Sequence, residues 1–276
     1  MNETIKTQLN HRSIRQFKPV ALAQEEVNLL VDVARHAPTS NFRQAYSIIS
    51  ITDEKLKEQI AEIANQPYIP NAGHLFVFVV DQRRNTLIAE AKGAKALVQG
   101  SPERFISAFS DAMIAAQNMV VAAESLGMGT VYLGSILNDN AKLSELLKLP
   151  KYVYPAVGLA VGWPDQEPQL KPRLPRHVIH MENYYKDLEN PLAELKDYDA
   201  EVHEYYDLRD LNNRVDEFTT QIAKTMDNSV ANRANTLKDL QKLGFLIDYK
   251  SSLIESFYKS NNVIDERNSF ASSFFS

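Results

Sequence analysis

The sequence predicts an α+β fold in which a mixed sheet of four to five strands is wrapped by helices. Three observations carry this prediction. Segments with the apolar spacing of amphipathic helices alternate with short β-branched runs as far as residue 162. One of these runs, LFVFVV at 75–80, is apolar throughout, which is typical of a central strand buried on both faces. The 276 residues are 44% hydrophobic, enough for a sizeable core.

Each element has a local signal of its own. We expect helices at about 25–36, 53–64, 111–126 and 140–148, and strands at 46–51, 75–80, 131–135 and 156–162. Asp53 is a favourable N-cap residue, and Gly127 stands where helices often end in a glycine. The helix at 111–126 is apolar on nearly every side, which indicates burial in a large core or in a subunit interface.

The chain changes character after Trp163. Residues 164–191 contain several prolines and little periodicity, which predicts an extended arm. From Leu192 onward the pattern is helical and charged, and the last thirty residues are weakly patterned. We expect one domain over 1–246 with a helical C-terminal excursion, followed by an extension at 247–276 of unknown role.

Composition excludes several kinds of site. The net charge of −5 argues against a broad nucleic-acid surface, so no nucleic-acid partner is expected. The absence of cysteine excludes disulfides, iron–sulfur clusters and thiolate nucleophiles. His177 and His180 are three residues apart without a third ligand nearby, so no metal site is expected.

The location follows from what the apolar segments can do. The first fifteen residues are polar and lack the apolar run of a signal peptide. The longest apolar stretch, 112–123, is too short to span a bilayer. We therefore expect a cytoplasmic protein without a membrane partner.

Cationic side chains gather in a few short segments of this acidic chain. The first holds His11, Arg12, Ser13 and Arg15 just before a helix. Guanidinium forks and a hydroxyl suit a phosphate group. Taken alone, however, this segment is better explained as a solvated basic turn.

Two further clusters follow. In the arm, a proline fixes the backbone between Lys171 and Arg173, although an exposed linker would have the same composition. Arg209 and Arg214 flank a run of amide side chains that also suits a solvated loop between helices. Together the clusters favour phosphate binding, provided that they meet in space.

Seven segments, in order, resemble the nitroreductase family. They are HRSIRQF at 11–17, APTSNFRQ at 37–44, NQPYI at 65–69, AAESLGMGTVYLGS at 122–135, GLAVGWP at 158–164, KPRLP at 171–175 and LNNR at 211–214. Within the family, the chain is similar to the branch of NADPH-specific, oxygen-insensitive nitroreductases and NADPH:flavin oxidoreductases. This resemblance implies an intertwined homodimer with non-covalent FMN at its interface and the apolar helix at its centre.

The resemblance also implies roles for individual residues. His11, Ser13, Lys171 and Arg173 match the family's phosphate site, and Arg12 lies in the same run. Arg15 matches the cation beside N1 and the C2 carbonyl of the flavin, and Gln66 matches the side chain that bonds the pyrimidine edge.

Three further matches concern the partner subunit, the flavin ring and the nucleotide. Thr39, Ser40 and Asn41 match a loop that the partner subunit supplies. Tyr132, Leu133, Gly134 and Ser135 match the strand end near flavin N5, where Ser135 replaces the family's usual glycine. Arg209 and Arg214 match the NADPH-recognition loop.

The activity implied is an FMN-dependent NADPH oxidoreductase with ping-pong kinetics. NADPH would be the hydride donor, and nitroaromatics, quinones, azo compounds or free flavin would be the small-molecule acceptors. The cofactor carries this chemistry, so no side chain is expected as catalytic acid, base or nucleophile. Three alternatives remain: another reaction of the superfamily such as reductive dehalogenation, a non-enzymatic flavin-binding protein, and an acidic helical scaffold.

Overall fold

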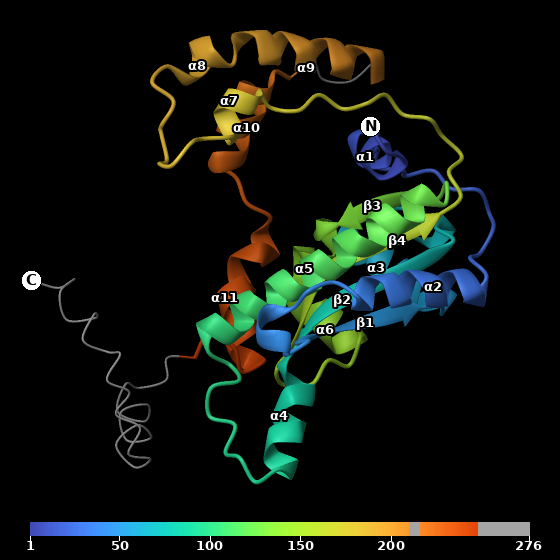
Figure 1. Ribbon diagram of the computed structural model, residues 1–276, viewed down its shortest axis with the longest axis vertical. Helices are drawn as coiled ribbons and strands as arrows, with labels where there is room; N and C mark the ends of the chain where they lie inside the picture. The colour runs from blue at the N-terminus through green and yellow to red at the C-terminus, as the bar shows by residue number, and fades with distance from the viewer. Residues whose placement is uncertain (210–215, 248–276) are drawn as a thin grey trace, which may run out of the picture.

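The computed structural model describes residues 1–209 and 216–247, without the side chains of 206–209. Its strands form one sheet in the order β1-β2-β4-β3 (Figure 1). They are β1 (Tyr46–Ile51), β2 (His74–Asp81), β3 (Gly129–Leu133) and β4 (Val153–Gly162). Each pairing between these strands is antiparallel, and a parallel bridge joins Ser13 to Thr130. The α+β class and a sheet of four strands are confirmed.

Helices cover both faces of this sheet. In the described residues they are α1 (Glu3–Leu9), α2 (Gln24–Arg35), α3 (Glu54–Ala64), α4 (Gln82–Ala91), α5 (Pro102–Ser125), α6 (Asn140–Leu146), α7 (Arg176–Ile179), α8 (Pro191–Glu194), α9 (Lys196–Arg209), α10 (Phe218–Met226) and α11 (Thr236–Lys242). Short 3₁₀ helices lie at Ser40–Phe42, Ile69–Asn71, Gly134–Asp139 and Ala231–Asn235. α2 and α5 pack on one face of the sheet, and α3 and α6 pack on the other.

The strand β2 lies at the centre of the core. Its eight residues are all buried, because successive side chains point to opposite faces and both faces are covered. Phe76 and Phe78 pack with α2 and α5, whereas Leu75 and Val77 pack with α3 and α6. The expectation of a strand buried on both sides is confirmed.

The long helix α5 begins earlier than the sequence pattern predicted. It starts at Pro102 rather than at Asp111, because the Ser101 side chain caps the new end by accepting from the Arg104 amide at 3.3 Å. Proline at the first helical position suits this start. The apolar spacing of Phe105, Ala108 and Phe109 continues that of the predicted helix, so the earlier start follows the same pattern.

The full length of α5 also corrects the argument about membranes. With 24 residues, α5 is long and apolar enough to cross a membrane by length and composition. The membrane argument from residues 112–123 therefore used too short a length for this apolar helix. Ala112, Ala116 and Met119 are buried against the sheet and α2, as in the core helix of a soluble protein.

The sequence predicted two helix ends correctly from their capping residues, but it placed the end of one strand less accurately. The Asp53 side chain accepts from the Leu56 amide at 2.8 Å, and Gly127 has φ +82°, so both predicted helix boundaries are confirmed. β3 ends at Leu133, two residues earlier than expected, because the chain turns into a 3₁₀ helix there. The helices α1 and α4 were not predicted, and α7 interrupts the arm that was expected to be extended.

The C-terminal part leaves the sheet and returns to it. Beyond β4 the arm runs extended past α1, and α7 to α10 form a layer apart from the sheet (Figure 1). A small cluster of Leu195, Tyr198 and Val202 holds this layer together. α11 rejoins the main core, where Phe245 is fully buried. Apart from residue 247, the predicted extension lies outside the described residues, so the division at 246 stays a prediction.

The N-terminal segment is attached to the edge of the sheet beside β3. The Ile14 amide donates to the Thr130 carbonyl at 2.9 Å, and the Ile14 side chain is buried. This close approach requires glycine at 129, since a Cβ there would lie 2.5 Å from Ile14 Cγ1. Side chains alternate in an extended segment, so Ser13 and Arg15 are left on the other side.

Replacing Gly129 with alanine should lower the free energy of unfolding by about 1–3 kcal/mol, because the added methyl group overpacks against Ile14. Chemical denaturation measures the loss. Gly134→Ala is the matched control, since nothing lies within 4 Å of its added Cβ. Equal stability of the two variants would contradict the close approach.

Candidate functional site

The first two cationic clusters line one cavity of about 470 Å³, although about 160 residues separate them in the sequence. The N-terminal segment contributes His11, Arg12, Ser13 and Arg15, and the arm contributes Lys171 and Arg173. The remaining lining consists of Gln166, Glu167, Pro168, Gln169 and Tyr205. We call this cavity the cationic pocket. The condition that the two clusters meet in space is therefore fulfilled.

Backbone pairing brings the arm to the N-terminal segment. Phe17 and Pro164 form an antiparallel bridge. On either side of it, the Lys18 amide donates to the Trp163 carbonyl at 2.8 Å, and the Asp165 amide donates to the Gln16 carbonyl at 2.9 Å. The arm thus leaves the sheet alongside residues 11–15, and its lysine and arginine reach the same cavity.

The charge of the cationic pocket suits an anion. Four arginine and lysine side chains line it, against the single carboxylate of Glu167. Arg12 Nε is buried, and no group in the described residues accepts a hydrogen bond from it. The Arg173 guanidinium donates to the Lys171 carbonyl at 2.7 Å, which fixes the guanidinium within the turn. A phosphate group would supply acceptors to such donors, each bond contributing about 1.5–3 kcal/mol.

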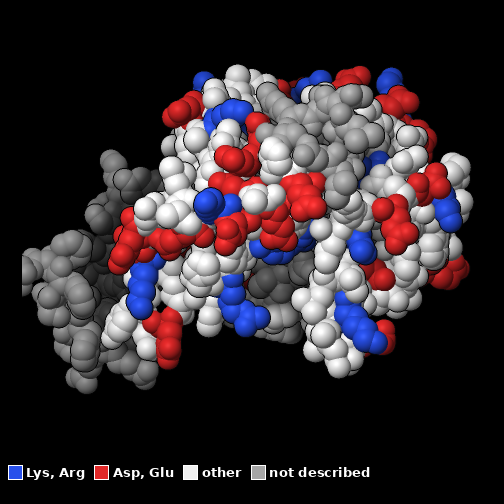
Figure 2. Space-filling model, turned by 90° about the horizontal axis from the view of Figure 1, so that it is seen from above, with Lys and Arg blue, Asp and Glu red and all other residues white. Residues whose placement is uncertain are grey.

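The outer surface above the arm has the opposite charge. Figure 2 shows Asp and Glu side chains gathered in a band over this end of the molecule, where α8 and α9 lie. Glu194, Asp197, Glu201 and Glu204 belong to these two helices and are exposed. Tyr205 of α9 lines the cationic pocket, so these acidic helices lie beside it, and their carboxylates limit the positive potential on the outer surface.

Arg15 extends the site from the cationic pocket toward the loop after α3. Burial raises the pKa of the Tyr68 hydroxyl, whereas the positive charge of Arg15 and a hydrogen bond with it act in the opposite direction. Gln66 lies two residues before Tyr68 and is half-buried. Its backbone amide donates to the Ala61 carbonyl at 3.0 Å. Arg15 therefore connects the cationic pocket to the loop that carries Gln66.

The predicted strand end at 132–135 is a strand followed by a 3₁₀ turn. Leu133 is the last strand residue and is buried, whereas Gly134 is exposed and Ser135 is half-buried. The Tyr132 hydroxyl donates to Gln117 Oε1 at 3.2 Å. Burial and the carboxylate of Glu124 hold the pKa of the Tyr132 hydroxyl above its ordinary value, so this group stays protonated.

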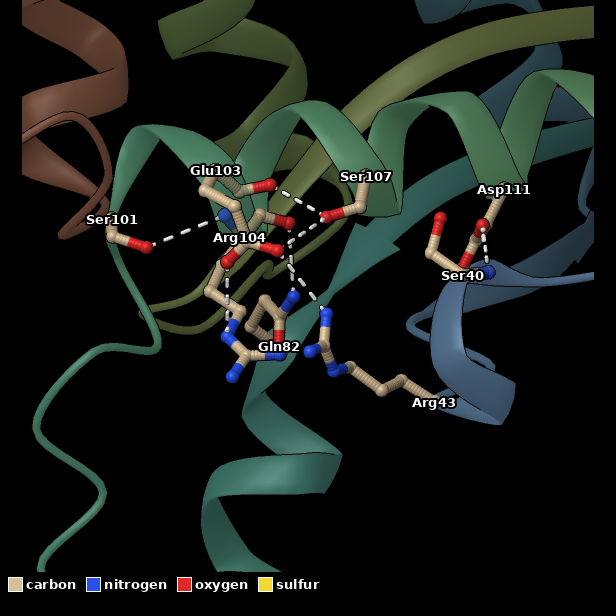
Figure 3. Close-up of polar contacts among 8 residues, drawn as sticks. All are labelled: Ser40, Arg43, Gln82, Ser101, Glu103, Arg104, Ser107 and Asp111. Carbon is tan, nitrogen blue, oxygen red and sulfur yellow. Dashed lines mark hydrogen bonds and ion pairs between the residues drawn. The ribbon is translucent and has the colours of Figure 1, made fainter. Parts of the chain in front are cut away.

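The loop of Thr39, Ser40 and Asn41 does not line the cationic pocket. The Ser40 amide donates to Asp111 Oδ1 at 2.8 Å, as Figure 3 shows, so α5 holds this loop. The other end of α5, near residue 124, approaches the pocket. The thirteen residues between them span about 20 Å at 1.5 Å per residue. Within one chain, the loop is therefore far from the residues of the cationic pocket.

A larger cavity of about 850 Å³ lies beside this loop, and the arginine side chains in its lining are already paired with carboxylates. Arg43 and Arg104, both in its lining, bind the Glu103 carboxylate at 3.3 Å (Figure 3). Arg84 is 3.4 Å from Asp81 and also donates to the Tyr46 carbonyl. The smaller cationic pocket is therefore the better anion site.

Sequence reasoning missed three side chains around the site. Glu124 and Thr130 lie behind His11, and Arg233 donates to the Gly134 carbonyl at 3.0 Å. Glu124 stands inside the recognised segment 122–135, next to a glycine-rich turn, which was the only local signal for it. Arg233 comes from a segment 99 residues beyond Gly134 and has no local signal at all.

The structure describes only the backbone of one of the two residues expected to recognise NADPH. The backbone of Arg209 ends α9, but its side chain is not described, and Arg214 lies outside the described residues. Tyr205, four residues before Arg209, lines the cationic pocket, so the end of α9 lies beside it. Among the described residues, no group of three His, Asp or Glu side chains is arranged to hold a metal ion.

Two family models match the chain in succession. The model described as "Nitroreductase family" matches residues 9–163, which is more than half of the chain. The model described as "Nitroreductase family, C-terminal domain" matches residues 171–248. Together they cover both halves of the cationic pocket.

Individual relatives are similar over most of their length. A protein of Staphylococcus aureus (strain USA300) named NADPH-dependent oxidoreductase is 42% identical over 240 residues, 86% of this chain and 95% of the relative. The structure of B. megaterium NfrA1 is 39% identical with a TM-score of 0.84, covering 89% of this chain and 100% of that one. The NADPH:FMN oxidoreductase from Vibrio harveyi, solved with NAD⁺, is 33% identical with a TM-score of 0.79, covering 89% and 99%.

Proposed function

Since the chain belongs to the nitroreductase family, we propose that it is an NADPH-dependent oxidoreductase that uses non-covalently bound FMN. The observation that carries the proposal is the convergence of the two cationic clusters on one cavity. An acidic protein that collects four arginine and lysine side chains in one pocket, beside a buried unpaired Arg12 Nε, is suited to hold a phosphate.

The cofactor's phosphate fits the residues that line this pocket. Arg12, Lys171 and Arg173 offer positive charge, and the Ser13 hydroxyl offers a donor that is half-buried at the pocket wall. FMN ends in a phosphate monoester, whereas FAD carries a second nucleotide. The pocket therefore favours FMN, with His11 as a further donor.

The remaining residues of the site would surround the flavin ring. Arg15 would stabilise negative charge at N1 and the C2 carbonyl, and Gln66 would bond the pyrimidine edge. Tyr132 to Ser135 would pass the ring near N5, where the exposed Gly134 leaves room for a close approach. Thr39, Ser40 and Asn41 would act on the flavin of the partner subunit, because the length of α5 separates them from their own pocket.

An intertwined homodimer would complete each site. On α5, Ile106 and Ile114 are exposed although the helix is mainly apolar, and Leu126 just after it is exposed too. Exposed apolar side chains on a core helix are typical of an interface between subunits. A second copy of this chain would cover them and bring residues 39–41 to the neighbouring pocket. We expect this dimer to be cytoplasmic.

The chemistry would be two-electron transfer through the bound cofactor. When bound, FMN supplies a ring that accepts hydride from NADPH and passes two electrons to a second substrate. Nitroaromatics, quinones, azo compounds and free flavin are suitable acceptors. Because donor and acceptor would occupy the same place in turn, ping-pong kinetics are expected. The residues of this chain bind, orient and tune the cofactor, and none need act as acid or base.

The test of this function is to identify the flavin and show that it turns over. Denaturing the purified protein should release FMN, and anaerobic NADPH should bleach the bound flavin until an acceptor is added. Release of FAD, or no flavin after incubation with FMN, would contradict the cofactor. A yellow protein that NADPH does not bleach would instead be a flavin-binding protein without this activity.

Lys171→Ala should raise the dissociation constant for FMN about tenfold, the lower end for a charge-assisted hydrogen bond because Lys171 is exposed. Arg15→Ala should instead make the reduction potential of the bound flavin more negative, since a cation beside N1 favours the reduced anion. Lys186→Ala, an exposed lysine in the same arm outside the pocket, is the control. Unchanged affinity and potential in both variants would refute the site.

NADPH should be preferred to NADH about ten- to a hundredfold in kcat/KM, one or two steps of about 1.4 kcal/mol. Only a cation near the 2′-phosphate distinguishes the two nucleotides strongly, and Asp210 beside Arg209 moderates the preference. In Arg209→Ala the loss should fall mainly on NADPH. Lys196→Ala, at the other end of α9, serves as control. Equal losses for both nucleotides would show that Arg209 does not read this phosphate.

A further inference from the structure

A largely buried carboxylate lies behind His11, on the side away from the cationic pocket. Glu124, in the last turn of α5, has a side chain only 12% exposed. Its Oε1 atom accepts from the Thr130 hydroxyl at 2.7 Å and lies 2.6 Å from Nδ1 of His11. A negative charge beside an anion site opposes binding unless it serves another purpose, so this position needs an explanation.

Thr130 holds the carboxylate in one place. Thr130 is fully buried, and its backbone pairs with the N-terminal segment through the bridge to Ser13 and the bond from the Ile14 amide. The hydroxyl, the carboxylate and His11 therefore link β3, α5 and the N-terminal segment. The buried Thr130 hydroxyl fixes the position of Glu124 Oε1. The carboxylate in turn restrains the orientation of the His11 ring.

The contact decides which ring nitrogen of His11 carries hydrogen. An ionised carboxylate only accepts hydrogen bonds, so Nδ1 must be the donor. Nε2 is then the ring atom left for a ligand, and no described residue bonds it. A ring that donates from Nδ1 to Glu124 and from Nε2 to a phosphate oxygen is an imidazolium, whose positive charge lies between two anions.

We propose that Glu124 is a positioning residue for phosphate recognition: it holds His11 by Nδ1 and presents Nε2 as a donor to the phosphate of the flavin. This inference rests on the proposed function. If the proposal is correct, the Glu124 carboxylate strengthens the binding of FMN and has no effect on the binding of riboflavin, which lacks the phosphate. If Glu124 were only an uncompensated charge behind the pocket, removing the charge would tighten FMN binding instead.

The test compares FMN with riboflavin on the full-length protein stripped of flavin. Glu124→Gln keeps the shape of the side chain but removes the charge. Its dissociation constant for FMN should rise about ten- to a hundredfold, the range for a hydrogen bond to a charged group, while that for riboflavin changes less than threefold. Glu58→Gln, an exposed glutamate on α3, is the matched control and should change neither. Flavin fluorescence quenching measures both constants.

A double-mutant cycle separates positioning from direct action. His11→Ala combined with Glu124→Gln should bind FMN no more weakly than His11→Ala alone, because Glu124 acts through the histidine. Thr130→Val, which replaces the hydroxyl with a methyl group of similar size, should also weaken FMN binding, by a smaller factor. This variant keeps the test open should Glu124→Gln fail to fold.

Three outcomes would overturn the proposal for Glu124. They are tighter FMN binding in Glu124→Gln, equal losses for FMN and riboflavin, and additive losses in the double variant. A failure of the proposed function has a different signature. The wild-type protein would then bind neither flavin, or would bind FMN no more tightly than riboflavin, and the cationic pocket itself would lose its assignment.

Discussion

The attachment of residues 13–17 to the edge of the sheet is the contact on which the functional surface depends. Ile14 can lie against β3 only because residue 129 has no side chain. The bond from its amide to Thr130 then fixes Ser13 and Arg15 on the outer side. The same extended run pairs with the start of the arm through Phe17. One extended segment, paired with β3 on one side and with the arm on the other, therefore places both halves of the cationic pocket.

The helix α5 connects the core with the site at both of its ends. Its buried side chains pack on β2 and β4, which fixes the helix relative to the sheet. Asp111 accepts from the amide of Ser40, and Glu124 binds His11. These two carboxylates hold loops that are about 20 Å apart along the helix. A single helix thus sets the geometry of two segments that lie far apart within one chain.

Acidic and basic side chains occupy different parts of the molecule: carboxylates are exposed on the outer helices, and several cations line a cavity. The chain is acidic overall, and its exposed outer helices carry much of that charge. Cations near the larger cavity, such as Arg43 and Arg84, are neutralised by carboxylates of the chain. In the cationic pocket, Arg12 instead retains a buried donor without a partner. A bound phosphate would accept a hydrogen bond from this Nε–H group. The unpaired donor is therefore consistent with the proposed anion site.

Sequence by itself determined the strands of the sheet, most of the helices packed on it and the chemical character of the site. The β-branched runs, the Asp53 cap and Gly127 gave the strands and helix ends, because these signals act between near neighbours. The clusters at 11–15 and 171–173 indicated phosphate binding, and the resemblance named the family. Only the tertiary structure decided that these clusters meet and that Glu124 contacts His11. Such contacts join residues more than a hundred positions apart, and only the pairing at the edge of the sheet brings them within bonding distance.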